Sequence, residues 1–135
     1  MFTSENWPIG ANMLSFGNRA PDGTPMQDAS SAVWAGQLRQ VRDLGVTQVD
    51  PTDAWLPLAQ LSDARIDEFR RVLDGEGMSL SSISMTRNSV VDVEHGERNL
   101  AHAKRFVEIA PHFGVDVVNT GFMQALTLEQ NAQIW

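Results

Sequence analysis

The sequence contains no cysteine, which excludes a disulfide-stapled secreted scaffold, a thiolate zinc site and cysteine nucleophile chemistry. It also lacks a basic run, since ten Lys and Arg oppose seventeen Asp and Glu and leave a net charge of −7. Nucleic acids and anionic membranes both require clustered positive charge, so we expect neither as a partner. No apolar run approaches the roughly 20 residues of a membrane span, and the amino-terminal residues do not resemble a signal peptide. With 42% hydrophobic residues, the composition predicts a soluble, cytoplasmic, globular chain.

One pattern recurs three times along the chain: a helical segment, a glycine and then a short apolar strand. It occurs at Leu44-Gly45-Val46, at Glu76-Gly77-Met78 and at Phe113-Gly114-Val115, where the glycine suits the end of the helix. With a first strand at 9–16, the strands begin near residues 9, 46, 78 and 115, which are 37, 32 and 37 residues apart. Helical crossovers favour parallel pairing. The sequence therefore predicts an α/β protein of about four parallel units, with strands near 9–16, 46–50, 78–85 and 115–120.

Apolar residues spaced three and four apart predict a helix in each of the three connections. The first runs from about Ser31 to Leu44. The second opens after Ser62, a good N-cap, with Asp63 in its first turn. The third spans His95 to His112, and Pro111 must end it within a turn.

Near the carboxyl end, Thr127 and Gln130 form a capping box, which predicts a fourth helix that is still short at Trp135. Four units fit either a small doubly wound open sheet or half of an eight-stranded parallel barrel, which needs about 250 residues. The first loop contains neither a G-x-G-x-x-G nor a P-loop pattern, so a nucleotide-binding open sheet is disfavoured.

Three stretches carry a family resemblance: Ile9-Gly10-Ala11-Asn12, the segment 38–50 and the segment 99–121. They are similar to sugar isomerases/epimerases of the xylose isomerase-like TIM-barrel superfamily. The resemblance implies that residues 1–135 form the N-terminal half of a (β/α)8 barrel. It also implies a divalent metal of the Mn, Mg, Co or Zn type, whose Glu, Asp and His ligands come from later strands and not from this chain.

In a parallel barrel, functional side chains follow the carboxyl end of each strand. Hydrogen-bonding side chains together with an aromatic platform are typical of carbohydrate pockets. We predict a substrate-binding role for Asn12, Asp50, Asp53, Trp55, Arg87 and Asn119, with Ser15, Thr86, Asn88 and Thr120 at the same strand ends.

Each of these residues also has a purely structural alternative. Asp50 and Asp53 form an acid/base or cation-binding pair, or they cap the loop that follows the strand. Trp55 lines the pocket or packs beneath its own loop. Arg87 binds a substrate phosphate or carboxylate, or pairs with a loop acid. Asn119 hydrogen-bonds either the substrate or the backbone.

The histidines at 95, 102 and 112 lie on or beside the third predicted helix without a metal-binding partner one turn away, so we expect them to be solvated. The resemblance implies metal-assisted proton transfer on a sugar or sugar phosphate, with this chain as one wall of the pocket and inactive alone. A related carbohydrate lyase, such as a C-glycoside deglycosidase subunit, is one alternative. The other is a non-catalytic α/β binding module, which forms a homodimer or pairs with a complementary half-barrel through its open sheet edges.

Overall fold

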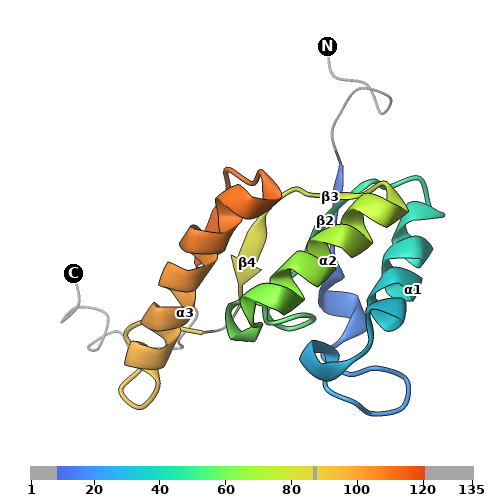
Figure 1. Cartoon of the computed structure of the whole chain (residues 1–135). Coiled ribbons are helices and arrows are strands. Elements are labelled where there is room, and N and C mark those ends of the chain that lie inside the picture. The colour runs from blue at the N-terminus through green and yellow to red at the C-terminus, as the bar shows by residue number, and fades with distance from the viewer. Residues whose placement is uncertain (1–8, 87, 121–135) are drawn as a thin grey trace.

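A computed structural model describes residues 9–86 and 88–120 of the chain. Within these residues, strands and helices alternate as predicted, and Figure 1 shows α1, α2 and α3 on the same side of the strands. Arg87 and the predicted capping box at Thr127 lie outside the described residues. The strands are β1 (Gly10–Asn12), β2 (Gln48–Asp50), β3 (Ser79–Leu80), β4 (Ile83–Met85) and β5 (Val118–Thr120), and the α-helices are α1 (Ser31–Arg42), α2 (Asp63–Glu76) and α3 (Gly96–Ile109).

The predicted third strand, 78–85, is divided into two short strands with different neighbours. β3 pairs in parallel with β2, and β4 pairs in parallel with β5. The change of partner occurs within three residues: the Ser81 amide donates to Val49, whereas the Ile83 amide donates to Val117. A bridge between Thr52 and Ser84 joins the two ladders. The order β1, β2, β3/β4, β5 therefore follows the chain, and the predicted parallel pairing is confirmed.

The first strand is shorter than predicted because residues 13–16 form a 3-10 helix, η1 (Met13–Phe16), instead of continuing the strand. The Asn12 side chain causes this change, since its Oδ1 accepts a hydrogen bond from the Leu14 amide at 2.9 Å. Such a local side-chain bond competes with the sheet ladder for the backbone. As a result, Asn12 is both the last residue of β1 and the cap of the turn that follows.

The helix ends follow the predicted signals. Ser62 caps α2, with its Oγ accepting from the Arg65 amide at 3.4 Å, and Gly77 ends that helix in the left-handed conformation with φ 65°. The third helix changes after Ile109 to a 3-10 turn, η4 (Ala110–Phe113), because Pro111 cannot continue an α-helix. Two other 3-10 turns, η2 (Met26–Asp28) and η3 (Leu58–Gln60), precede α1 and α2.

The two faces of the sheet differ sharply in polarity. Val49 and Leu80 are partners in one register row and are buried beneath the helices. The adjacent row on the other face consists of Gly10, Gln48 and Ser79, which are small or polar. The hydrophobic core therefore lies between the sheet and its helices, and its largest fully buried side chains are Trp34, Trp55, Phe69, Phe106, Met13 and Met26.

An ion-pair cluster joins the carboxyl ends of α1 and α2, and it predicts a pH-dependent stability. Arg39 and Arg42 approach Glu76 at 2.7 and 2.6 Å, and the hydrogen bond from Arg39 holds the pKa of Glu76 below its usual range. A carboxyl with a lowered folded-state pKa stabilises the fold above its unfolded-state pKa. Glu76→Gln should therefore lower Tm at pH 7, and the difference from wild type should vanish as the pH falls through the lowered pKa. Thermal unfolding from pH 7 to pH 3 measures this.

The control for this prediction is Glu97→Gln, which changes an exposed carboxyl in the first turn of α3. Its effect at pH 7 should be the smaller of the two, because Glu97 has no comparable arginine pair within the described residues. A Tm difference for Glu76→Gln that stays constant down to pH 3 would contradict the assignment.

No α-helix within residues 9–86 and 88–120 exceeds 14 residues, and none has the length and hydrophobicity needed to cross a bilayer.

Candidate functional site

Four polar side chains meet where the strands end, one from each parallel unit. Asn12 Nδ2 donates to Asp50 Oδ2 at 3.3 Å, and Ser84 Oγ donates to the same oxygen at 2.6 Å. Asn119 Nδ2 in turn donates to Ser84 Oγ at 3.0 Å. We call Asn12, Asp50, Ser84 and Asn119 the strand-end network. Successive members are 38, 34 and 35 residues apart, so the network repeats with the period of the β/α unit.

The carboxylate of Asp50 determines the direction of every hydrogen bond in this network. The Ser84 hydroxyl donates its single proton to Asp50 Oδ2. The Ser84 oxygen is then left to accept from the amide nitrogen of Asn119. This arrangement leaves Asn119 Oδ1 as an acceptor on an exposed residue, and it also points the exposed Asn12 amide at Asp50. The buried pair Asp50 and Ser84 thus orients two amides at the surface.

Two buried oxygens beside the network have no hydrogen-bond partner in the part of the chain that the structure describes. They are Asp50 Oδ1 and Thr52 Oγ1, on residues that are 9% and 0% exposed. The hydrogen bonds of Asp50 are not those of a residue that caps the loop after its own strand. Its carboxylate bonds β1 and β4 rather than residues 51–56.

Asp53 has a different role from Asp50. Its Oδ1 accepts from both the amide and the hydroxyl of Thr86, at 2.7 and 2.6 Å, and its Oδ2 accepts from Asn88 Nδ2. The Asp53 amide also donates to Ser84 O at 3.1 Å. Asp53 therefore connects the loop after β2 to the loop after β4, whereas the Asp50 carboxylate bonds Asn12 and Ser84.

The prediction that Trp55 offers a ring face to a sugar is wrong. Trp55 is fully buried, its Nε1 donates to Gln37 Oε1 at 2.5 Å, and its ring packs edge-on against Phe69 with centroids 5.9 Å apart. The ring is held in the core because the loop after β2 folds back beneath α1 and α2. The predicted site residue Arg87 lies outside the described residues, and Ser15 and Thr120 are exposed beside the network without joining it.

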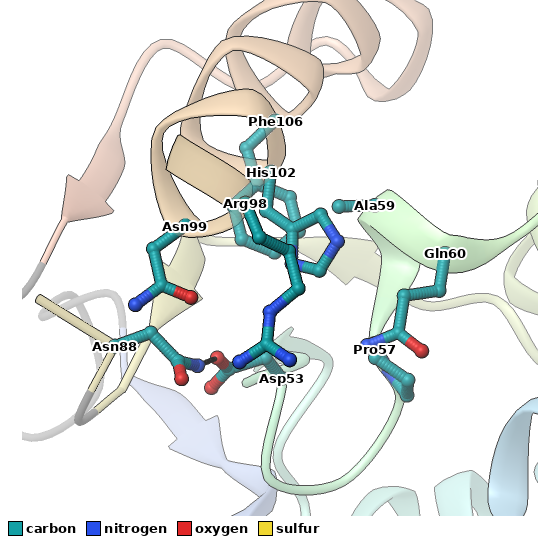
Figure 2. A pocket seen from close by; sticks show the side chains of 9 residues that line it. All are labelled: Asp53, Pro57, Ala59, Gln60, Asn88, Arg98, Asn99, His102 and Phe106. Atoms are coloured by element: carbon teal, nitrogen blue, oxygen red, sulfur yellow. Dashed lines mark hydrogen bonds between the residues drawn. The ribbon is translucent and has the colours of Figure 1, made fainter. Parts of the chain in front are cut away.

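A cavity of about 350 Å³ opens beside these loops, between η3 and the first turns of α3. Figure 2 shows side chains from α3 facing Asp53 and Asn88 on one side and the turn at Gln60 on the other. His102, which we expected to be solvated, is half-buried in its wall. The residues that line the cavity are Asp53, Pro57, Ala59, Gln60, Asn88, Arg98, Asn99, His102 and Phe106.

Sequence reasoning missed Ser84 and the polar residues of α3. Ser84 lies between Ile83 and Met85 in a strand, and alternation places its side chain on the face opposite to theirs. Its spacing from Asp50 and Asn119 matches the unit repeat, and that spacing was the available signal. A parallel series of β/α units with polar side chains at the carboxyl ends of its strands is the architecture of a (β/α)8 barrel wall.

Comparison with known proteins supports this class. No protein-family model and no curated protein matches the chain. A solved structure does: the crystal structure of a xylose isomerase-like TIM barrel protein from Mycobacterium smegmatis in complex with magnesium, at 65% sequence identity and a TM-score of 0.85. The match covers 100% of this chain and 44% of that protein. The chain is thus similar to a xylose isomerase-like TIM barrel protein and spans less than half the length of that relative, which confirms the predicted likeness to part of such a barrel.

Proposed function

We propose that the chain forms one wall of the carbohydrate-binding pocket of a sugar isomerase/epimerase-like enzyme. The observation that carries the proposal is the fixed polarity of the strand-end network. Asn119 Oδ1 is presented as an acceptor because Asp50 orients Ser84, and Ser84 orients the Asn119 amide. Sugar hydroxyls donate to such acceptors. Because the acceptor is already oriented before the substrate arrives, the entropic cost of binding is reduced. In this proposal Asn12 and Asn119 contact the substrate, whereas Asp50 and Ser84 are positioning residues.

The proposed reaction is proton transfer at a carbon beside a sugar carbonyl, giving isomerisation or epimerisation. The superfamily likeness supports this reaction class. The described residues contribute binding and orientation: the network holds a hydroxyl of the substrate at a defined position, so that groups elsewhere in the barrel reach the reacting carbon.

A divalent metal is part of the proposal because the similar Mycobacterium smegmatis structure contains magnesium. Within residues 9–86 and 88–120, no three His, Asp or Glu side chains are grouped so that they could hold a metal ion. The strand-end network offers a single carboxylate, Asp50, and Mg²⁺ takes about six oxygen ligands. The described residues therefore do not fit a metal site by themselves, and we route no step through the ion.

The proposed function is tested by measuring kcat and KM of the full-length protein on aldoses, ketoses and their phosphates, with Mg²⁺ present. Asn119→Ala should raise KM, and Ser84→Ala should lower kcat/KM by about tenfold, because one hydrogen bond to an oriented acceptor contributes about 0.5–1.5 kcal/mol. Ser84→Thr keeps the hydroxyl and should recover most of the loss.

Thr120→Ala provides the matched control, since Thr120 is exposed on the same strand and is not a member of the network. It should leave KM unchanged. Absence of turnover on every sugar tested, or equal effects of Asn119→Ala and Thr120→Ala, would contradict the proposal.

A further inference from the structure

We propose that the cavity between η3 and α3 is a second binding site, for a monosaccharide-sized polyol that carries one phosphate or carboxylate group. The cavity shares no residue with the strand-end network, so the inference does not depend on the proposed function. Its volume of about 350 Å³ lies at the lower end of the range of small-molecule sites, about 300–1,000 Å³.

Arg98 supplies the positive charge. In Figure 2 its side chain extends from α3 into the space above Asp53 and Asn88. Within the described residues, Arg98 has neither a hydrogen bond nor an ion pair, so its five N–H groups are available to an anion. The carboxylate of Asp53 is the only acidic group in the described cavity wall, and three donors from Thr86 and Asn88 already occupy it.

Asn99 supplies an acceptor whose orientation is fixed. Its Nδ2 donates to the backbone carbonyl oxygen of Ser89 at 2.8 Å. Because a carbonyl oxygen can only accept, this hydrogen bond fixes which atom of the Asn99 side-chain amide is the nitrogen and which is Oδ1. Asn99 is only 3% exposed, and its Oδ1 has no partner among the described residues. A buried acceptor without a donor destabilises the folded protein. Because Asn99 lines the cavity, a hydroxyl of a bound ligand would satisfy this oxygen.

The remaining walls suit a sugar ring. Phe106 and Pro57 provide apolar surface, while Gln60 and His102 provide further donors and acceptors around the rim. Figure 2 shows Gln60 and His102 on opposite sides of the cavity, from η3 and α3 respectively. A ligand with hydroxyls on its ring and an anionic group at one end matches this arrangement of side chains. Its anionic group would bind Arg98, a hydroxyl would donate to Asn99 Oδ1, and its ring would pack against Phe106.

The test is a calorimetric titration of the full-length protein with glucose 6-phosphate, glucose and inorganic phosphate as probes. Glucose 6-phosphate should bind more tightly than either of the others, because only it engages both Arg98 and Asn99. Arg98→Gln should raise its Kd by at least about tenfold, since a charge-assisted hydrogen bond is lost. The side-chain amide resonance of Asn99 should shift on binding in NMR spectra.

Arg71→Gln is the matched control, because Arg71 is exposed on α2 and does not line the cavity. It should leave Kd unchanged. Ser84→Ala alters the strand-end network and not the cavity, so glucose 6-phosphate should still shift the Asn99 side-chain amide resonance in this variant. Equal Kd values for wild type and Arg98→Gln would overturn the proposal. So would equal binding of glucose 6-phosphate and inorganic phosphate, or the absence of the Asn99 amide shift in Ser84→Ala.

Discussion

Replacing Phe69 with alanine should lower the free energy of unfolding by about 4 kcal/mol, the cost of a large-to-small change at a fully buried aromatic residue. Phe69 has no exposed surface. Its ring lies edge-on to Trp34, Trp55 and Phe113, with centroid distances of 5.6, 5.9 and 5.8 Å. Each such pair adds about 0.5–1.5 kcal/mol beyond the buried area.

The effect is expected to be large because Phe69 connects three units. Trp34 belongs to α1, Trp55 to the loop after β2 and Phe113 to η4, so a cavity at Phe69 loosens contacts on all three sides. Denaturant unfolding measures the change. The control is Leu44→Ala, at a side chain that is 84% exposed, which should cost under about 0.5 kcal/mol. Similar costs for the two variants would show that Phe69 is not the centre of the core.

Replacing Asp53 with alanine should destabilise the fold by about 3 kcal/mol, because it removes the acceptor of three hydrogen bonds at once. The donors are the Thr86 amide, the Thr86 hydroxyl and Asn88 Nδ2, and they belong to the loop of the neighbouring unit. If Asp53 instead bound the substrate, replacing it with alanine would reduce turnover more than stability. The half-buried position of Asp53 keeps water from replacing all three bonds.

Unfolding free energies of three variants separate these roles. Asp53→Asn keeps the Oδ1 acceptor for Thr86 and should lose less stability than Asp53→Ala. Asp116→Ala, at an exposed aspartate, should change stability by no more than about 0.5 kcal/mol. If Asp53→Ala leaves the unfolding free energy intact and only kcat/KM falls, the loop-fastening role is wrong.

The order of helices and strands could be predicted from the sequence because local signals determine it. Ser62 and Gly77 act through their own backbone and side chains, and they begin and end α2 where expected. The division of the third strand could not be predicted in this way. Residues 79–85 change partner from β2 to β5, and that change depends on the position of two other strands rather than on any residue inside the segment.

The same distinction applies to the site. The rule that functional side chains follow parallel strands selects Asn12, Asp50 and Asn119, and the structure brings these three side chains together. Trp55 was misplaced because its burial depends on Phe69 and Gln37, which are distant in sequence. Arg98 and Asn99 lie on α3, and the apolar periodicity of that helix predicts only which of its faces is buried. The pattern does not predict the cavity between α3 and η3.

The parallel pairing of successive units also bears on how the chain folds. Each ladder, and each bond of the strand-end network, joins residues no more than 38 positions apart. All residues of the β1–β2 ladder are therefore present once the chain has been synthesised as far as Asp50, and those of β3 are present once it reaches Leu80. Because the entropic cost of closing a loop grows with its length, these closures cost less than pairing strands from distant parts of a longer chain. During synthesis, the wall can therefore assemble from its amino-terminal edge one unit at a time, with each finished unit serving as the template for the next.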